Sequence, residues 1–307
     1  MKMETFIITS KCDNLPLGIT VMEPEGDCRG VVQISHGMAE HKERYYGFME
    51  YLAKEGYASV INDHRGHGAS VRNEDDLGFF YDDRGESLVE DLHQITLYIK
   101  EKFSGKPVFL FGHSMGSIAA RVYIKKYDDC VDKLILSGAP CRNPLVNLAK
   151  LLVKLQASVK GDRYRSPIMY SLFLGSFEKA VDKGEKPSAW LSVNKENVEE
   201  YERDPLCGFR FTLNGYLNLA SLLSDAFSSE GWQMKNRGLD ILFLAGEKDP
   251  VIGGEKAWHG SRDFLKERGY EKVSGKLYNN MRHEILLETD KENVYKDIVA
   301  FLQGGKI

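Results

Sequence analysis

The sequence predicts an α/β fold in which a mostly parallel central sheet is flanked by helices and carries an inserted helical cap. Three observations support this class. Short apolar runs alternate with amphipathic segments over the first 140 residues, residues 141 to about 235 are helical in pattern, and strand patterns return from residue 239. Alternating strands and helices imply βαβ units, whose parallel strands are buried by helices on both faces.

The first part of the chain predicts an opening pair of strands, "TFIITS" and "LGITVME", followed by four buried strands. The buried strands are short and rich in Val, Ile, Leu and Phe, and the segments between them have helical periodicity. The buried strands are expected at 30–35, 58–63, 108–112 and 133–138, and the helices at 45–55, 86–103 and 115–127.

After Pro140 the strand patterns stop, and "NPLVNLAKLLVKLQ" is the clearest helix of this stretch. The stretch is too long for an ordinary loop, so we expect a helical cap inserted into one core. The predicted core is 1–140 with 236–307, and the predicted cap is 141–235. Within the second part of the core we expect strands at "LDILFLAG" (239–246) and "KLYNN" (276–280), and helices near 255–268 and 290–303.

The composition is that of an ordinary globular protein, with 42% hydrophobic and 28% charged residues among 307. The formal net charge of −4 and the lack of a long Lys/Arg run predict no nucleic-acid partner. Five scattered cysteines without CxxC spacing fit a reducing compartment. With no apolar leader and no apolar run of roughly 18 residues, we expect a soluble, cytoplasmic protein that meets lipid only at a surface.

The segment "GHSMG" (112–116) has the pattern G-x-S-x-G, with a predicted strand before it and a predicted helix after it. In that context the serine occupies a strained turn, and its Oγ is exposed at the carboxyl end of the strand. Ser114 is therefore the candidate nucleophile. The backbone N–H of Met115 starts the helix and is suited to a developing oxyanion.

A serine hydroxyl needs a base, and this arrangement places an acid and then a histidine after later strands. Asp249 in "LFLAGEKDPV" follows a predicted strand, and its Asp-Pro pair favours it over Glu247. His283 in "LYNNMRHEILLE" follows the last strand, whereas His259 falls within a predicted helix. The expected catalytic triad is Ser114, Asp249 and His283.

Other motifs predict neither a metal nor a cofactor. His64 and His67 in "DHRGHG" lack a third ligand, so we interpret that segment as a structural turn. "RHEILLE" is not HExxH, and the chain has no P-loop or GxGxxG. We expect His36, Glu40 and His41 to lock their loop by hydrogen bonds, and Cys207 to be a small buried apolar side chain.

Five segments together resemble the α/β-hydrolase superfamily, most closely its monoacylglycerol lipase and lysophospholipase branch, often grouped with serine aminopeptidases. They occur in family order, without departure at the nucleophile, acid or base. The resemblance implies that the N–H of Met38 is the second oxyanion donor. The segments are "HGMAEH" (36–41), "DHRGHG" (63–68), "GHSMG" (112–116), "GEKDP" (246–250) and "MRHE" (281–284).

The resemblance and the leucine-rich cap imply a lipid ester of medium or long acyl chain as substrate, with transient membrane-surface contact through the cap. Two alternatives stay open. An aminopeptidase would need a cap carboxylate for the substrate amine, and Glu199, Glu200 and Glu202 are available, although their run predicts a solvated helix face. A binding protein without activity usually has a broken triad, and here all three positions are filled.

Overall fold

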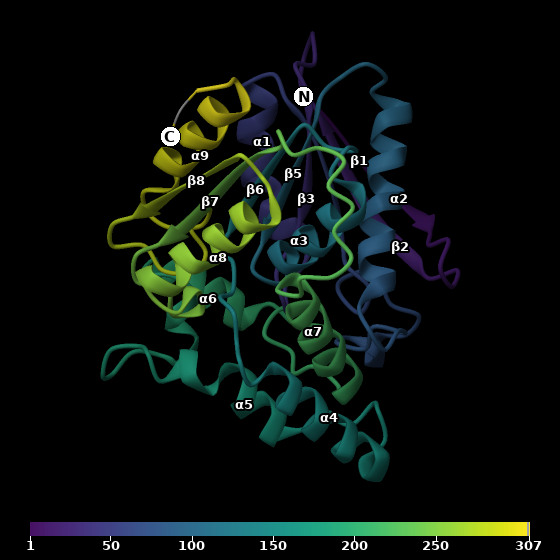
Figure 1. Ribbon diagram of the computed structural model, residues 1–307, viewed down its shortest axis with the longest axis vertical. Coiled ribbons are helices and arrows are strands. Elements are labelled where there is room, and N and C mark those ends of the chain that lie inside the picture. Colours follow the sequence, from purple (N-terminus) through teal and green to yellow (C-terminus); the bar gives the residue numbers. More distant parts are fainter. Residues whose placement is uncertain (306) are drawn as a thin grey trace.

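The computed structural model, which describes residues 1–305 and 307, contains one sheet of eight strands in the order β1-β2-β4-β3-β5-β6-β7-β8 (Figure 1). β1 pairs antiparallel with β2, β2 pairs antiparallel with β4, and all later neighbours are parallel. The strands are β1 Lys2–Thr9, β2 Pro16–Glu23, β3 Val31–Ser35, β4 Ala58–Asn62, β5 Val108–His113, β6 Lys133–Ser137, β7 Asp240–Gly246 and β8 Lys272–Tyr278.

Helices cover both faces of this sheet, because its central strands are apolar on both sides. In β5, Leu110 packs into the core beneath α2, α3 and α8, and Phe111 packs into the core beneath α1 and α9. The helices of the core are α1 Tyr46–Lys54, α2 Glu86–Lys102, α3 Met115–Tyr127, α8 Glu255–Arg268 and α9 Lys291–Leu302, with the 3₁₀ helices η1 Lys42–Tyr45, η2 Glu74–Asp76 and η4 Pro250–Ile252.

The predicted alternation of strands and helices is confirmed, including the opening pair of strands, which the structure shows to be antiparallel. The last strand is the exception, because we expected it at 276–280 and it spans Lys272–Tyr278. β8 is one of the two edge strands of the sheet, and most of its residues are only half-buried. It therefore lacks the continuous apolar signal of a buried strand, and only its apolar end was recognised.

Between β6 and β7 the chain forms four further helices, here named the inserted helices. Figure 1 shows α4 and α5 at the end of the molecule farthest from both termini, with α6 and α7 closer to the sheet. Within the described residues, no helix combines the length and the apolar character needed to cross a membrane. The inserted helices are α4 Val146–Lys160, α5 Pro167–Glu178, α6 Lys195–Arg203 and α7 Leu213–Ala226, with the 3₁₀ helix η3 Pro187–Leu191 before α6.

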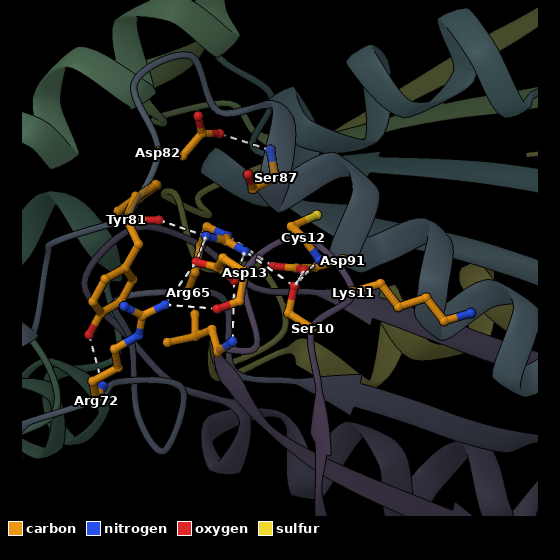
Figure 2. Close-up of polar contacts among 12 residues, drawn as sticks. Ser10, Lys11, Cys12, Asp13, Arg65, Arg72, Tyr81, Asp82, Ser87 and Asp91 are labelled. Atoms are coloured by element: carbon orange, nitrogen blue, oxygen red, sulfur yellow. Dashed lines mark hydrogen bonds and ion pairs between the residues drawn. The ribbon is translucent and has the colours of Figure 1, made fainter.

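A buried polar cluster fastens the β1–β2 turn to α2 (Figure 2). Arg65 Nε donates to Asp91 Oδ2 at 2.9 Å, and Ser10 Oγ donates to the other oxygen of the same carboxylate. Arg65 Nη1 also donates to the carbonyl of Phe80 at 2.8 Å. The segment "DHRGHG" is thus held in place by side-chain bonds, as expected for a structural turn.

Candidate active site

Ser114 lies in the tight connection between β5 and α3, with φ 50° and ψ −117°. Such a conformation is costly for a non-glycine residue and persists only where the surroundings enforce it. A Cβ at Gly116 would lie 2.0 Å from the carbonyl oxygen of Ser35, and one at Gly112 would lie 2.6 Å from the carbonyl oxygen of Gly116. Both flanking glycines are therefore required by the close approach of the backbone around Ser114.

Asp249 and His283 follow β7 and β8 and meet at the same edge of the sheet. Asp249 is the N-cap of η4, where its Oδ1 accepts from the N–H of Val251 at 2.8 Å. Its Oδ2 lies 2.9 Å from His283 Nδ1. Both side chains are almost fully buried. A carboxylate only accepts hydrogen bonds, so this contact assigns the proton to Nδ1 and leaves Nε2 as an acceptor.

The protonation of His283 is controlled by its surroundings. Burial of the His283 ring lowers its pKa. The charge of Asp249 and the hydrogen bond with Asp249 raise this pKa, and the charges of Glu284 and Glu40 raise it further. The net result is a pKa above the usual 6.5. A base with this character is suited to accept a proton near neutral pH.

Ser114 and His283 line the same cavity. His283 packs against His113, the residue before Ser114, with ring centroids 4.6 Å apart. It also packs closely on Gly138, where an added Cβ would lie 2.9 Å from both the Cε1 and Nδ1 atoms of His283. The fold therefore brings the predicted nucleophile, acid and base into one small region.

The loop after β3 reaches the same region. An added Cβ at Gly37 would lie 3.3 Å from the Cβ of Ser114. His36 Nδ1 lies 2.8 Å from the carbonyl oxygen of Gly37, which shares a planar peptide unit with the N–H of Met38. That contact orients the Met38 N–H, which the sequence resemblance identifies as an oxyanion donor.

The loop 36–41 is held by the hydrogen bonds predicted for its polar residues. The N–H of Gly37 donates to Glu40, and the N–H of His64 donates to His36 Nε2 at 2.9 Å. Burial lowers the pKa of His36 to about 3, so its ring is neutral near neutral pH. His41 Nε2 lies 2.8 Å from Asp204 Oδ2, which ties this loop to the end of α6.

The cavity has a volume of about 740 Å³, within the usual range for small-molecule sites. Trp190 lies beside the predicted base, with its ring centroid 5.1 Å from that of His283. Apolar residues of α4, α5 and α7 make up much of the rest of the wall. They include Leu148, Leu152, Leu172, Phe173, Leu219 and Leu223, and Leu145 directly before α4 also lines the cavity.

Sequence reasoning missed some residues of this region. Nothing in the pattern distinguished Trp190 or Arg44, and Glu284 entered only as the last residue of "MRHE". Arg44 and Glu284 form a buried ion pair beside the predicted triad. Glu202 is exposed, as the interpretation of "NVEEYERD" as a solvated helix face predicts, but it also lines the cavity and accepts from Lys186 at 2.6 Å. Contacts that depend on the placement of η3 against α6 leave no local signature in the sequence.

One cluster of metal-ligating side chains occurs within the described residues, formed by His41, Asp204 and Cys207. Its ligand atoms lie within 4.8 Å of one another, and two of them already pair with each other. Burial raises the pKa of the Cys207 thiol well above its usual range. This favours the neutral thiol, which agrees with the predicted role of Cys207 as a small buried side chain.

Comparison with known proteins identifies a matching family and several relatives over most of the chain. The profile of the family described as "Serine aminopeptidase, S33" matches residues 26–290. The chain is 26% identical over 286 residues to a monoacylglycerol lipase of Mycolicibacterium smegmatis, covering 92% of this chain and 91% of that protein. It is 28% identical over 299 residues to a probable lysophospholipase L2 of Haemophilus influenzae, covering 92% and 86%.

Among solved structures, the chain superposes on a thermostable carboxyl esterase from Bacillus coagulans with a TM-score of 0.91 and 24% identity, over 99% of both chains. A lipase in an open form gives a TM-score of 0.88 at 22% identity, again over 99% of both chains. At these identities, the similarity to the two structures establishes the fold alone. The family profile spans most of the chain, and the protein therefore belongs to the serine aminopeptidase S33 family, in the monoacylglycerol lipase and lysophospholipase branch of the α/β-hydrolases.

Proposed function

We propose that this protein hydrolyses carboxylic esters of lipid type, monoacylglycerols or lysophospholipids, through a Ser-His-Asp acyl-enzyme mechanism. One observation carries the proposal. The strained Ser114 lines the same apolar cavity as His283, and the ring of His283 is bonded to the buried carboxylate of Asp249. The names of the relatives, a monoacylglycerol lipase and a probable lysophospholipase, support lipid ester hydrolysis.

In the proposed mechanism, Ser114 Oγ attacks the ester carbonyl carbon while His283 Nε2 takes the hydroxyl proton. Asp249 holds the ring in the required tautomer and stabilises its positive form. The N–H groups of Met38 and Met115 donate to the oxyanion, each worth roughly 3 kcal/mol of transition-state stabilisation. His283 then protonates the leaving alcohol, and water releases the acid from Ser114 by the same steps.

Residues 141–235 are the proposed cap, which supplies the site for the acyl chain. Leucines of α4 and α7 line the cavity, and a chain of eight or more carbons would bury its methylenes there at about 0.8 kcal/mol each. The proposed head group lies beside Trp190, because His283 must reach the leaving oxygen to protonate it.

We also propose that α4 and α5 touch a lipid surface during substrate uptake. α4 exposes large apolar side chains and carries Lys150, Lys154 and Lys160 without an acidic residue, a composition that favours an anionic interface. Val159 is 79% exposed, an unusual state for a large apolar side chain. The other exposed large apolar residues are Leu145, which directly precedes α4, and Leu148, Leu151, Leu152, Leu155, Ile168 and Leu172 of the two helices.

The alternative is amide hydrolysis in the manner of an aminopeptidase, which would require a free cap carboxylate for the substrate amine. Glu202 lines the cavity, but Lys186 is already paired with it at 2.6 Å. This pairing favours an ester over an aminoacyl amide. A cytoplasmic location stays a prediction, for which cell fractionation is the test.

The test is a substrate panel assayed with the wild type, Ser114→Ala and the control Ser261→Ala, whose serine is buried on α8. The panel contains p-nitrophenyl esters from C2 to C16, 1-monoacylglycerol, lysophosphatidylcholine and an aminoacyl amide. We expect turnover that peaks at C8 or longer, is lost in Ser114→Ala and is kept in Ser261→Ala. Amide cleavage without ester cleavage would select the aminopeptidase, and no turnover at all would select the binding protein.

A further inference from the structure

The guanidinium group of Arg44 lies between two buried carboxylates. Arg44 Nη1 and Nη2 donate to the two oxygens of Glu284 at 2.7 and 2.9 Å, and Nη1 lies 3.4 Å from Glu40 Oε2. The side chains of Arg44, Glu40 and Glu284 are 9%, 4% and 5% exposed. A bidentate pair of this kind has a defined geometry as well as a favourable energy.

Each carboxylate is attached to a different part of the proposed catalytic machinery. Glu40 accepts from the N–H of Gly37, the residue before the proposed oxyanion donor Met38. Glu284 directly follows His283, and its own N–H donates to the carbonyl of Leu191 at 2.7 Å. Arg44 therefore connects the oxyanion loop to the loop that carries the base.

The inserted helix α6 joins the same network. Asn197 accepts from Arg44 Nη2 at 2.8 Å and donates to Glu284 Oε2 at 2.8 Å. The ring of Tyr201 lies 4.9 Å from the Arg44 guanidinium carbon, and its hydroxyl donates to the carbonyl of Ala39. Side chains from three separate segments thus meet on one guanidinium group.

We propose that Arg44 is a positioning residue, which holds the oxyanion loop, the His283 loop and helix α6 at fixed distances from one another. Arg44 does not line the cavity, so its effect on catalysis is indirect and acts through Glu40 and Glu284. This inference rests on the proposed function, because it assigns Arg44 a part in the proposed acyl transfer.

The electrostatics give this role a specific signature. Burial raises the pKa of Glu40; the charge of Arg44 lowers it, and the charge of Glu284 raises it. Without Arg44, two neighbouring buried carboxylates would repel each other when both are ionised, and the loops that carry them would separate. The separation would grow as pH rises, because more of the molecules would carry both charges.

The experiment compares Arg44→Met and Arg44→Lys with the control Lys133→Met. Lys133 is 15% exposed and donates to the carbonyl of Phe301, but it begins β6 at the edge of the sheet opposite Ser114. We expect kcat for an optimal ester to fall about 10²-fold in Arg44→Met, the scale of a misplacement of about 1 Å, with KM changed less than about threefold. Arg44→Lys is expected to recover part of kcat, and Lys133→Met to match the wild type.

The pH profile separates positioning from a purely structural role. Arg44→Met is expected to lose further activity above neutral pH, where the wild type stays level. Glu284→Gln removes a charge that raises the pKa of His283. The acidic limb of the pH–activity profile of this variant is therefore expected to move to lower pH. The groups that face His283 are Asp249, Glu284, Glu40 and His113, and only Glu284 is changed in this variant.

Active sites are counted with a fluorophosphonate that reacts with Ser114, so that kcat refers to folded enzyme only. If Arg44→Met does not fold, Arg44→Lys and Glu284→Gln carry the test. An unchanged kcat and pH profile in folded variants would overturn the positioning role while the proposed function stands. If the wild type hydrolyses no ester, the proposed function fails, and the rate of fluorophosphonate labelling tests the role of Arg44 instead.

Discussion

His283 Nδ1 lies 2.9 Å from Asp249 Oδ2, and the two side chains are 2% and 0% exposed. The contact joins the loops that follow the last two strands of the sheet, 34 residues apart in the chain. Because water has little access to either group, their interaction is much stronger than that of an exposed pair. In the proposed mechanism the reactivity of the site depends on this contact, and the first two predictions follow from it.

The pH–activity profile of the wild type is expected to have an acidic limb whose midpoint lies above pH 6.5. His283 must be neutral to accept the serine proton, and its pKa lies above that usual value. The measurement is kcat/KM for a p-nitrophenyl ester over pH 5 to 9, corrected for unfolding by circular dichroism at each pH. An acidic limb centred below pH 6.5 would contradict the assignment.

Asp249→Asn is expected to reduce kcat about 10⁴-fold while the protein still folds. The Asn amide has only one oxygen, so it cannot accept from both the Val251 N–H and His283 Nδ1. The Nδ1 tautomer is then lost, and the positive ring is no longer stabilised. The residual activity should have its acidic limb at lower pH than the wild type, since Asp249 raises the pKa of His283. Glu247→Gln is the control, because Glu247 is the neighbouring acid that the triad does not use.

Gly138→Ala is expected to inactivate the enzyme by displacing His283, the proposed base. The new methyl group would lie 2.9 Å from two ring atoms of His283, in a backbone conformation of φ 54°. Gly161→Ala is the matched control, since Gly161 also has positive φ (81°) but its Cβ would meet nothing within 4 Å.

Both variants of this pair place an alanine at positive φ, which costs about 1–3 kcal/mol. Urea unfolding should therefore show a loss of stability in each, while only Gly138→Ala loses turnover per active site. Equal activity of the two variants would argue that His283 does not act as the base.

The triple variant Leu151→Ser, Leu155→Ser and Val159→Ser is expected to impair turnover at a lipid surface. These residues are 53%, 57% and 79% exposed on one side of α4, and none of them lines the cavity. Each loses an apolar contact with the acyl region of a bilayer, worth roughly 1.5–3 kcal/mol if fully buried.

The measurement for this triple variant is binding to vesicles of phosphatidylglycerol and phosphatidylcholine, together with hydrolysis of monoacylglycerol held in them. Hydrolysis of a soluble p-nitrophenyl ester is the internal control and should be unchanged. Vesicle binding equal to that of the wild type would overturn the proposed membrane contact of α4.

The local pattern of the sequence was sufficient to predict most of the strands and helices of the fold. Buried strands such as β5 are continuous apolar runs, and α8 spans Glu255–Arg268, as the periodicity predicted. The candidate triad could be predicted for the same reason: each residue follows a strand, and parallel strands end at one edge of the sheet. β8 was misplaced because an edge strand is half-buried and carries a weaker apolar signal.

Only the tertiary structure decided which side chains support that triad. Arg44 and Glu284 are 240 residues apart, and nothing in either neighbourhood predicts that they pair. Asn197 of α6 bonds both of them, so the whole network also depends on where α6 packs, which many side chains set together. The sequence by itself determined the strands, the strained serine turn and the order of nucleophile, acid and base, because these depend on neighbours in the chain. The buried charges around them depend on neighbours in space, and the folded chain alone brings those together.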